Sequence, residues 1–507
     1  MKNILFILTL CILFCFCNLW QVMAQELFEN YKVPEWFGRA KFGIWLHWGP
    51  QTLPLKGGGW YARHMYVEPD SIENEYWGKG AWEYHRVTFG HQSEFGYKDV
   101  CNLWRTDQFD ADRLVKLYKS WGARYVAIIA NHHDNFDLFK TTIHPWNSLN
   151  IGPKRDLVGE FAEAARNNHL KWMASVHAAR AKKWFATSVA SDSKGFLKGI
   201  LYDGNLTKAD GKGKWWEGYD PQQFYAHNYA DFEKELNERL IELVDNYEPD
   251  ILYFDDSRIP DFLWPACKYM YAKSMKKYGT VQAAITVKSK QVGTITVVEK
   301  GVADGIQEQP WQTETTLADD WFNKPNDDGS SRLLHDARSL KEMLVDVVSK
   351  RGNFMVNVAL NADGSIPQDQ FYIMEDVGNW VVGNSEAIYD TEPWKIYGEG
   401  GDMKSGHFNE RGINSRPWDY KVIRFTRDRN NKILYAHIFG DPSGKKITIS
   451  CLSPEKGLFT GKIRKISLIG SLEGIEWNLN TSGLDISMPE ELKFRNCNVL
   501  KIETTGL

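Results

Sequence analysis

The feature that most constrains the fold is a repeated order of helix, apolar strand and polar cluster along the first two thirds of the chain. Residues 111–122 carry apolar side chains at helical spacing and are followed by the apolar run 124–130 and by Asn131-His132-His133-Asp134. The same order returns at residues 156–177 and 230–256. Because each helix returns the chain to the start of the next strand, this order predicts a parallel α/β architecture.

The number of apolar runs favours a closed barrel over an open sheet. Seven or eight candidate strands lie between residues 42 and 360, each followed by a helix or a long loop, which predicts a (β/α)8-like barrel. A doubly wound open sheet is the alternative, but no glycine-rich dinucleotide turn follows any of the runs. Residues 180–220 interrupt the repeat, and we interpret them as an insertion over the strand ends.

From residue 391 onward the pattern changes to short strand-like runs without helices between them. This pattern predicts a C-terminal antiparallel β-sandwich over residues 391–507, after the barrel at residues 25–390. The C-terminal part is either a sugar-binding module or a cap on the barrel. We favour the cap, because this part has no cluster of catalytic residue types.

The N-terminus predicts export. A charged start, the apolar run 4–16 and the small residue Ala24 describe a secretory signal peptide at residues 1–24, cleaved after Ala24, with a periplasmic or extracellular destination. The run is shorter than the roughly 20 apolar residues of a membrane span, so no span is expected. A lipoprotein signal is a weaker alternative, since Cys15 and Cys17 follow Phe rather than small residues.

Charge and cysteine content exclude several classes of protein. Removing the signal peptide deletes Lys2 and no acid, so the net charge moves from −4 to −5, which gives no argument for nucleic-acid binding. The four remaining cysteines are too few and too scattered for a disulfide scaffold or a zinc site. One bridge between Cys451 and Cys497 and a set of unpaired buried thiols are both compatible with the sequence. No feature of the sequence predicts an oligomeric state.

Polar clusters follow the predicted strands, and the carboxyl ends of barrel strands meet at one mouth. The clusters are His47-Trp48, His132-His133-Asp134, His177, Asp255-Asp256, Lys288 and Glu299. A metal site is one alternative, but adjacent histidines on a strand face opposite ways and no H-x-H or H-E-x-x-H spacing occurs. No G-x-S-x-G turn is present either, which argues against an α/β-hydrolase. We therefore expect no metal and no organic cofactor.

The stretch 248–256 places two adjacent carboxylates at the end of a buried strand. Sugar cleavage needs two carboxyl groups, but neighbours on a strand point to opposite faces, so these two cannot form the pair. By strand alternation Ile251, Tyr253 and Asp255 share one face. If that face looks into the barrel, Asp255 is the reactive carboxylate and Asp256 lies outside the mouth.

Four stretches together resemble the α-L-fucosidases of glycoside hydrolase family 29, which are retaining enzymes. They are FGIWLHWGP (42–50), NHHDNF (131–136), PKRDLVGE (153–160) and LVDVVSKRGNFMVNVALNADGSIP (344–367). The matches run from about residue 36 to residue 394. The second stretch departs from the family's K-H-H-D-G-F at Asn131 and Asn135.

The resemblance implies roles for individual residues. Asp255 matches the family's nucleophile, at the end of a P-D-x-x-W-x-D strand in which Tyr253 replaces Trp. Trp60 matches the Trp of an E-W-Y motif, but Gly59 stands where the Glu would be. The expected substrate-binding residues are His47, Trp60, His132, His133, His177, Tyr253, Lys288 and Trp321.

The acid/base residue is expected about a dozen residues before Pro310-Trp311-Gln312, where Glu299 ends a predicted strand. Glu308 and Glu314 are the alternatives. The implied function is a retaining exo-glycosidase that releases α-linked L-fucose from a fucosylated oligosaccharide or glycoconjugate. A non-catalytic glycan-binding protein on a fucosidase barrel, suggested by Gly59, and a retaining hydrolase of a related L-sugar such as an α-L-galactoside are the alternatives.

Overall fold

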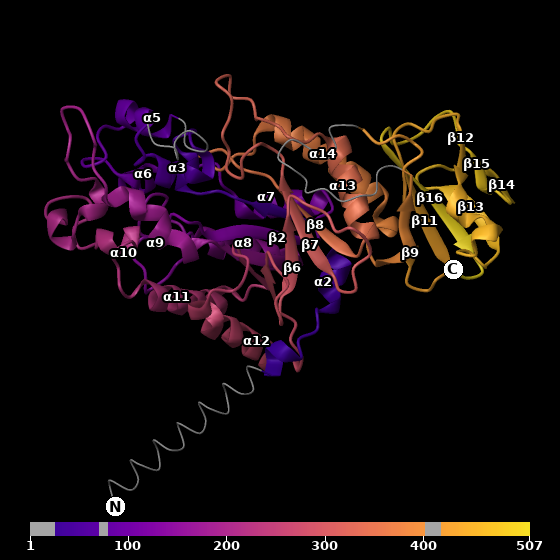
Figure 1. Cartoon of the computed structure of the whole chain (residues 1–507), viewed down its shortest axis with the longest axis horizontal. Helices are drawn as coiled ribbons and strands as arrows, with labels where there is room; N and C mark the ends of the chain where they lie inside the picture. Colours follow the sequence, from indigo (N-terminus) through magenta and orange to yellow (C-terminus); the bar gives the residue numbers. More distant parts are fainter. Residues whose placement is uncertain (1–25, 70–79, 401–416) are drawn as a thin grey trace, which may run out of the picture.

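The computed structural model describes residues 26–69, 80–400 and 417–507, so the predicted signal peptide at residues 1–24 lies outside the described part. Its centre is a closed barrel of eight parallel strands in sequence order (Figure 1). The strands are β1 (Phe42–Leu46), β2 (Tyr125–Asn131), β3 (Lys171–Val176), β4 (Ile251–Phe254), β5 (Ala284–Val287), β6 (Ile295–Glu299), β7 (Trp311–Thr316) and β8 (Gly352–Asn357). The predicted fold class, a (β/α)8-like barrel followed by antiparallel sheets, is confirmed.

Six helices follow strands of the barrel. They are α7 (Ala111–Ser120), α8 (Leu157–Asn167), α11 (Phe232–Tyr247), α12 (Trp264–Tyr278), α13 (Ala337–Ser349) and α14 (Gln368–Gly383). Local signals set several of their ends: the Asp156 side chain accepts from the Gly159 N–H at 3.0 Å at the start of α8, and Gly279 ends α12 with φ of 72°. Within the described residues no helix follows β5 or β6, so loops alone connect β5 to β6 and β6 to β7.

Strand alternation divides the barrel core into two layers. Ile251 and Tyr253 of β4 pack inside the barrel with Trp45 of β1, whereas Leu252 and Phe254 pack outward in the cluster that contains the helices. This is the face assignment that the sequence predicted for β4. It directs the next residue on the inner face, Asp255, to the mouth of the barrel.

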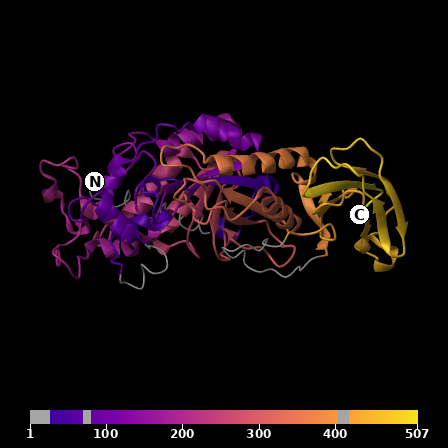
Figure 2. The same cartoon turned by 90° about the horizontal axis from the view of Figure 1, so that it is seen from above.

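The segments that interrupt the repeat form one end of the molecule. Short helices α3 (Tyr61–His64), α5 (Ala81–Thr88) and α6 (Tyr97–Leu103) lie beside α9 (Ala181–Trp184) and α10 (Pro221–Tyr225), opposite the C-terminal sheets (Figures 1 and 2). A buried ion pair joins the two segments, with Lys98 Nζ 2.9 Å from Asp203 Oδ2. Tyr97 also donates to Asp134 at 2.6 Å, which ties this end to the loop after β2.

The C-terminal part contains a five-stranded and a three-stranded antiparallel sheet. The first contains β9 (Thr391–Glu399), β10 (Ile423–Asp428), β11 (Ile433–Phe439), β13 (Ile463–Leu468) and β16 (Cys497–Thr504), and the second contains β12 (Lys446–Ile449), β14 (Glu476–Asn480) and β15 (Gly483–Ser487). Trp380 of α14 donates its indole N–H to the Cys497 carbonyl at 2.7 Å, so the first sheet packs on the barrel helices. Cys451 and Cys497 are unpaired and buried, as are the other two described cysteines, so no bridge joins them.

A search of the described helices for a membrane span, by length and apolar character, finds none.

Candidate active site

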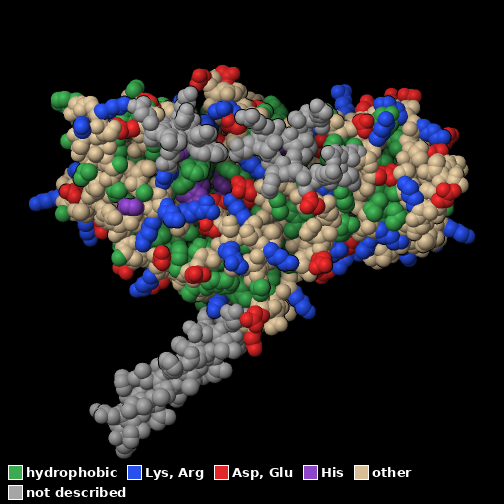
Figure 3. Space-filling view, viewed as in Figure 1, with side chains coloured by type: hydrophobic (Ala, Val, Ile, Leu, Met, Phe, Trp, Pro, Cys, Tyr) green, Lys and Arg blue, Asp and Glu red, His purple; other side chains and the backbone are tan. Residues whose placement is uncertain are grey.

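The carboxyl ends of the barrel strands surround one pocket of about 740 Å³, counting the space at its open mouth. The ten site residues expected from the sequence all line it: His47, Trp60, His132, His133, His177, Tyr253, Asp255, Lys288, Glu299 and Trp321. Figure 3 shows histidine side chains at the bottom of a hollow, with Lys and Arg side chains along one edge. The convergence follows from the parallel barrel, which brings every strand end to the same rim.

Asp255 follows β4 directly, and its side chain is only 15% exposed. Its Oδ2 atom lies 3.3 Å from His133 Nε2 and 3.6 Å from His177 Nδ1, and its Oδ1 atom forms an ion pair with Lys288. The neighbouring Asp256 accepts a hydrogen bond from Arg180 Nε at 2.8 Å and does not line the pocket. The two adjacent acids therefore have different surroundings.

Lys288 connects Asp255 to Glu299, the residue that ends β6. Its Nζ atom lies 2.6 Å from Glu299 Oε2 while it also contacts Asp255 Oδ1. Two oxygens bound to one nitrogen lie within about 6 Å of each other, twice the length of a hydrogen bond. That limit is compatible with the roughly 5–5.5 Å between the carboxyl groups of retaining glycosidases.

The charges of this cluster are set by burial and by the partners. Burial would raise the pKa of Asp255, but His177, His133 and the Lys288 ammonium outweigh it and hold the pKa of that carboxyl well below its usual range. Burial opposes the charge of Lys288 in turn, yet Asp255 and Glu299 raise its pKa above the ordinary value. Asp255 is therefore an anion at neutral pH, the form in which a carboxylate can attack carbon.

The histidines differ in what they present to the pocket. The Nδ1 atom of His47 bonds to Asn357 Oδ1 at 2.9 Å, which makes it the donor and leaves Nε2 as an acceptor. The Nδ1 atom of His132 bonds to the Gln51 amide nitrogen at 2.8 Å, which makes it the acceptor and leaves Nε2–H as a donor. Burial lowers the pKa of both rings well below the ordinary value, so both are neutral at pH 7.

The other two glutamates considered for the acid/base role lie elsewhere. Glu308 is exposed on the loop between β6 and β7 and does not line the pocket. Glu314 is fully buried inside the barrel, where it accepts from Tyr253 Oη at 2.7 Å and from Gln312 Nε2 at 3.2 Å. Burial raises the pKa of Glu314 to about 8. Among the described pocket residues, Glu299 is the single glutamate.

The pocket also contains residues that the sequence did not indicate: Trp45, Arg180, Trp184, Asp320 and Phe322. Trp184 packs against Trp60, with ring centroids 4.5 Å apart, and Phe322 packs against His132 at 4.8 Å. Arg180 and Trp184 follow β3 closely, and Asp320 and Phe322 flank Trp321. Their closeness in sequence to predicted site residues was the one signal that could have indicated them. The sequence does not predict the path of these loops.

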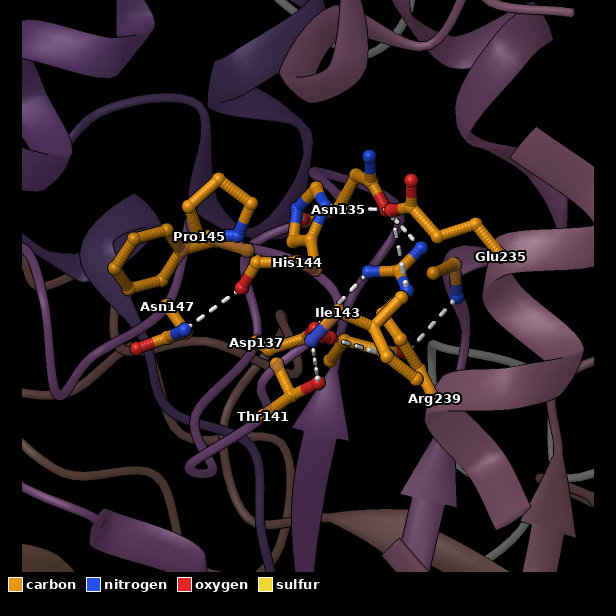
Figure 4. Close-up of polar contacts among 12 residues, drawn as sticks. Asn135, Asp137, Thr141, Ile143, His144, Pro145, Asn147, Glu235 and Arg239 are labelled. Carbon is orange, nitrogen blue, oxygen red and sulfur yellow. Dashed lines mark hydrogen bonds and ion pairs between the residues drawn. The ribbon is translucent and has the colours of Figure 1, made fainter. Parts of the chain in front are cut away.

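A buried polar network holds the loop that carries His132 and His133 (Figure 4). Arg239 of α11 donates to Asn135 Oδ1 at 2.9 Å and to Asp137 Oδ2 at 3.0 Å, and Asp137 Oδ1 accepts from Asn131 at 2.8 Å. Asn135 has φ of 56°, a left-handed conformation that Asn tolerates better than most residues. Asn131 and Asn135, the two departures from the resembled motif, thus both belong to this network.

One group of described side chains is close enough to hold a metal ion, with ring nitrogens of His132, His133 and His177 within 4.8 Å of one another. One nitrogen of each ring is hydrogen-bonded, to Gln51, the His177 carbonyl and Ser175, and the other nitrogens of His133 and His177 face Asp255 Oδ2 at 3.3 and 3.6 Å. The Lys288 ammonium holds the adjacent Asp255 carboxylate, and a second cation there would be repelled. The arrangement suits sugar hydroxyl groups better than a metal.

Comparisons with known proteins agree with this geometry. The family model described as alpha-L-fucosidase matches residues 21–386. Tissue alpha-L-fucosidase of Homo sapiens is 23% identical over 475 residues, which cover 91% of this chain and 86% of the human protein. The Rattus norvegicus protein of the same name is 26% identical over 380 residues, 73% of each chain.

Two solved structures have the same fold. The alpha-fucosidase of Thermotoga maritima in complex with fucose has a TM-score of 0.68 and 25% identity, covering 94% of this chain and 98% of its own. A family 29 alpha-L-fucosidase of Bacteroides thetaiotaomicron, described as a trapped covalent intermediate, has a TM-score of 0.63 and 17% identity, covering 93% and 95%.

A barrel with paired carboxylates at its mouth is the architecture of a glycoside hydrolase. The matched family model covers most of the chain, including all eight barrel strands. The chain belongs to the alpha-L-fucosidase family, glycoside hydrolase family 29, and is an enzyme of that family. The family resemblance predicted from the four sequence stretches is confirmed.

Proposed function

We propose that this enzyme releases α-linked L-fucose from a fucosylated oligosaccharide or glycoconjugate with retention of configuration. The observation that carries the proposal is the pair Asp255 and Glu299, joined by Lys288 in one pocket. The complex of the Thermotoga maritima relative with fucose supports the choice of sugar.

In the first step the Asp255 carboxylate attacks C1 of the fucosyl unit. Glu299, protonated, gives its proton to the departing glycosidic oxygen, so the bond from C1 to that oxygen breaks as the bond from C1 to Asp255 forms. The low pKa of Asp255 keeps the nucleophile ionised. The aglycone leaves as an alcohol.

In the second step Glu299, now a carboxylate, takes a proton from a water molecule. The water oxygen attacks C1 and expels the Asp255 carboxylate, and Glu299 is protonated again. Two inversions at C1 give net retention. Lys288 contacts both carboxyl groups and offers a cation to whichever of them is ionised, Asp255 before the first step and Glu299 after it.

The remaining pocket residues hold the sugar. His47 offers an acceptor and His132 a donor to its hydroxyl groups, while His133 and His177 orient Asp255. Trp60 and Trp321 supply apolar surface to the sugar ring and its methyl group. Tyr253 contributes its ring, because its hydroxyl is already bound to Glu314.

The direct test is kinetic. Asp255→Ala should lower the hydrolysis of an aryl α-L-fucoside by at least about 10⁴-fold, because the covalent route then has no nucleophile. Glu299→Ala should lose less hydrolytic activity than Asp255→Ala on an aryl fucoside with a good leaving group. Azide should restore the turnover of Glu299→Ala, because azide attacks the fucosyl-enzyme without needing a base. Glu308→Ala is the matched control and should hydrolyse the aryl fucoside at the wild-type rate, because Glu308 is exposed outside the pocket.

Two other outcomes would replace the proposal. A wild-type protein that binds L-fucose but turns over no fucoside would be a glycan-binding protein; the presence of both carboxylates in the pocket argues against this. Faster turnover of an aryl α-L-galactoside than of the fucoside would identify a hydrolase of that related sugar.

We also propose that the enzyme is exported and begins at Gln25 after signal cleavage, on the strength of the N-terminal pattern. N-terminal sequencing of the exported protein checks this, and an intact Met1 on the exported protein would contradict it.

A further inference from the structure

One carboxylate on the pocket wall has no role in the mechanism above. Asp320 lies in the loop between β7 and α13 and lines the pocket, next to Trp321. Its Oδ1 atom accepts hydrogen bonds from two backbone groups, the Gly59 N–H at 3.3 Å and the Phe322 N–H at 3.1 Å. These bonds fix the orientation of the carboxylate against the loop that carries Trp60.

The second oxygen of Asp320 is available to a ligand. Among the described residues, Oδ2 receives no hydrogen bond and forms no ion pair; it lies beside Gly58, where an added Cβ atom would collide with it, and the Asp320 side chain lines the pocket. Burial raises the pKa of this carboxyl, against the backbone bond from Phe322 and the charge of Lys324. A carboxylate that is largely desolvated gains more from a hydroxyl donor than one in water.

Gly58 and Gly59 lie against Asp320 and have no side chain of their own, so the carboxylate on this wall of the pocket comes from the loop that carries Asp320. A side chain at Gly58 would run into the Asp320 carboxylate. A Cβ atom at Gly59 would lie 2.7 Å from Phe322 Cδ2, closer than such contacts occur. Phe322 therefore occupies the space in front of Gly59, and residues 58 and 59 leave this wall without a side chain of their own.

His132 flanks the same glycine, because the Cβ position of Gly59 lies 3.6 Å from His132 Cε1. His132 offers a donor, Nε2–H, since its Nδ1 atom is bound to Gln51. A donor and an anionic acceptor on one wall match an alcohol, which both accepts and donates, and do not match an ether oxygen or a methyl group.

Resting on the proposed function, we propose that Asp320 is a substrate-binding residue that, together with His132, recognises one hydroxyl group of the sugar. Asp320 accepts the hydroxyl proton at Oδ2, and His132 donates to the hydroxyl oxygen. The pair thereby selects sugars that carry a hydroxyl at that ring position.

The first experiment separates recognition from loop structure. Asp320→Asn keeps an oxygen for the Gly59 and Phe322 N–H groups but removes the charge, and it should lower kcat/KM on an aryl α-L-fucoside by about 10- to 100-fold, mostly through KM. Asp319→Asn is the matched control, since its carboxylate pairs with Arg332 at 2.9 Å outside the pocket. It should have wild-type kinetics.

The second experiment identifies the hydroxyl. Wild type and Asp320→Asn are compared on aryl α-L-fucosides deoxygenated at C2, C3 or C4 in turn. Removal of one of these hydroxyl groups should lower kcat/KM of the wild type by about 10-fold or more. The same removal should change kcat/KM of Asp320→Asn little, because this variant has already lost the carboxylate that binds the hydroxyl. The other positions should lose activity equally in both proteins.

Three outcomes are distinguishable. Coupling at one hydroxyl supports the proposal. Full activity of Asp320→Asn, or equal losses at all three positions, overturns it and leaves Asp320 as a residue of the loop turn. A wild type that cleaves no fucoside overturns the proposed function instead, and binding of free L-fucose to wild type and Asp320→Asn, measured by calorimetry, then decides whether Asp320 contacts the sugar.

Discussion

At the scale of single residues, position inside the barrel decides which carboxyl groups are anions. Asp255 and Glu314 both lie on inward-facing positions, yet only Asp255 has cationic and imidazole partners that lower its pKa. Glu314 has neutral partners, so burial raises its pKa to about 8. One barrel thus holds an ionised acid at its mouth and a protonated acid below it at neutral pH.

The raised pKa of Glu314 predicts a pH effect on stability. The folded state keeps a proton that the unfolded state releases above about pH 4.3, so the free energy of unfolding falls as the pH rises from there to about 8 and then levels off. Glu314→Gln should remove this fall, so its stability relative to wild type should increase with pH, by up to about 1.4 kcal/mol per pH unit.

Urea denaturation of both proteins at several pH values between 5 and 8 measures the difference. Glu308→Gln, at an exposed position, is the control and should follow the wild-type pH profile. Parallel profiles for wild type and Glu314→Gln would contradict the buried, protonated state of Glu314.

At the scale of elements, the loop after β2 depends on a helix that follows β3. Arg239 of α11 is fully buried and donates hydrogen bonds to Asn135 and Asp137, which lie two and four residues after His133. Arg239→Met should lower the free energy of unfolding by about 3–5 kcal/mol, since it leaves the Asp137 carboxylate buried without its cation. It should also raise KM, because the loop carries His132 and His133.

The matched control is Lys234→Met on the same helix, where the side chain is 75% exposed. Denaturation and steady-state kinetics are measured on both variants. An Arg239→Met protein as stable as wild type would show that the network is not what holds the loop.

The elements predicted from the sequence were those with strong local signals. The buried runs that became β2, β3 and β4 each end in a polar cluster, and strand alternation in β4 assigned Asp255 to the mouth. Each strand was expected to be followed by a helix or a long loop, and the connections after β5 and β6 are loops, which have no periodic pattern in the sequence. Asp320 and Phe322 were missed because they reach the pocket through the course of a loop, which long-range contacts with Gly58 and Gly59 determine.

At the scale of the whole molecule, the C-terminal sheets have a core of their own, and one face of the first sheet also packs into the core of the barrel. Tyr435, Phe439 and Val499 belong to the same buried cluster as the barrel helices. Arg424 of β10, 1% exposed, pairs with Asp346 of α13 at 2.6 Å across the interface. We propose that the C-terminal part acts as a cap on the barrel helices, in line with the sequence-based preference.

Arg424→Met tests this coupling. Lys350 also pairs with Asp346 at 2.7 Å, so the carboxylate keeps one cation and the expected loss of stability is about 1–3 kcal/mol. If the two parts unfold as a unit, intrinsic fluorescence and circular dichroism should give one transition, shifted to lower denaturant. Arg495→Met changes an exposed side chain in the C-terminal part and is the control; it should leave the unfolding transition at the wild-type denaturant concentration. Two separate transitions in wild type would contradict this coupling.

In the proposed mechanism Asp255 forms a covalent bond to the sugar during turnover. The most direct measurement is to trap the enzyme with a 2-deoxy-2-fluoro-α-L-fucosyl fluoride, digest it and locate the added mass by tandem mass spectrometry. If Asp255 is the nucleophile, a single labelled peptide should carry the sugar on Asp255, and Asp255→Asn should carry no label. A sugar attached to another residue, or an enzyme that turns over the fluoride without any covalent adduct and releases β-L-configured product, would contradict it.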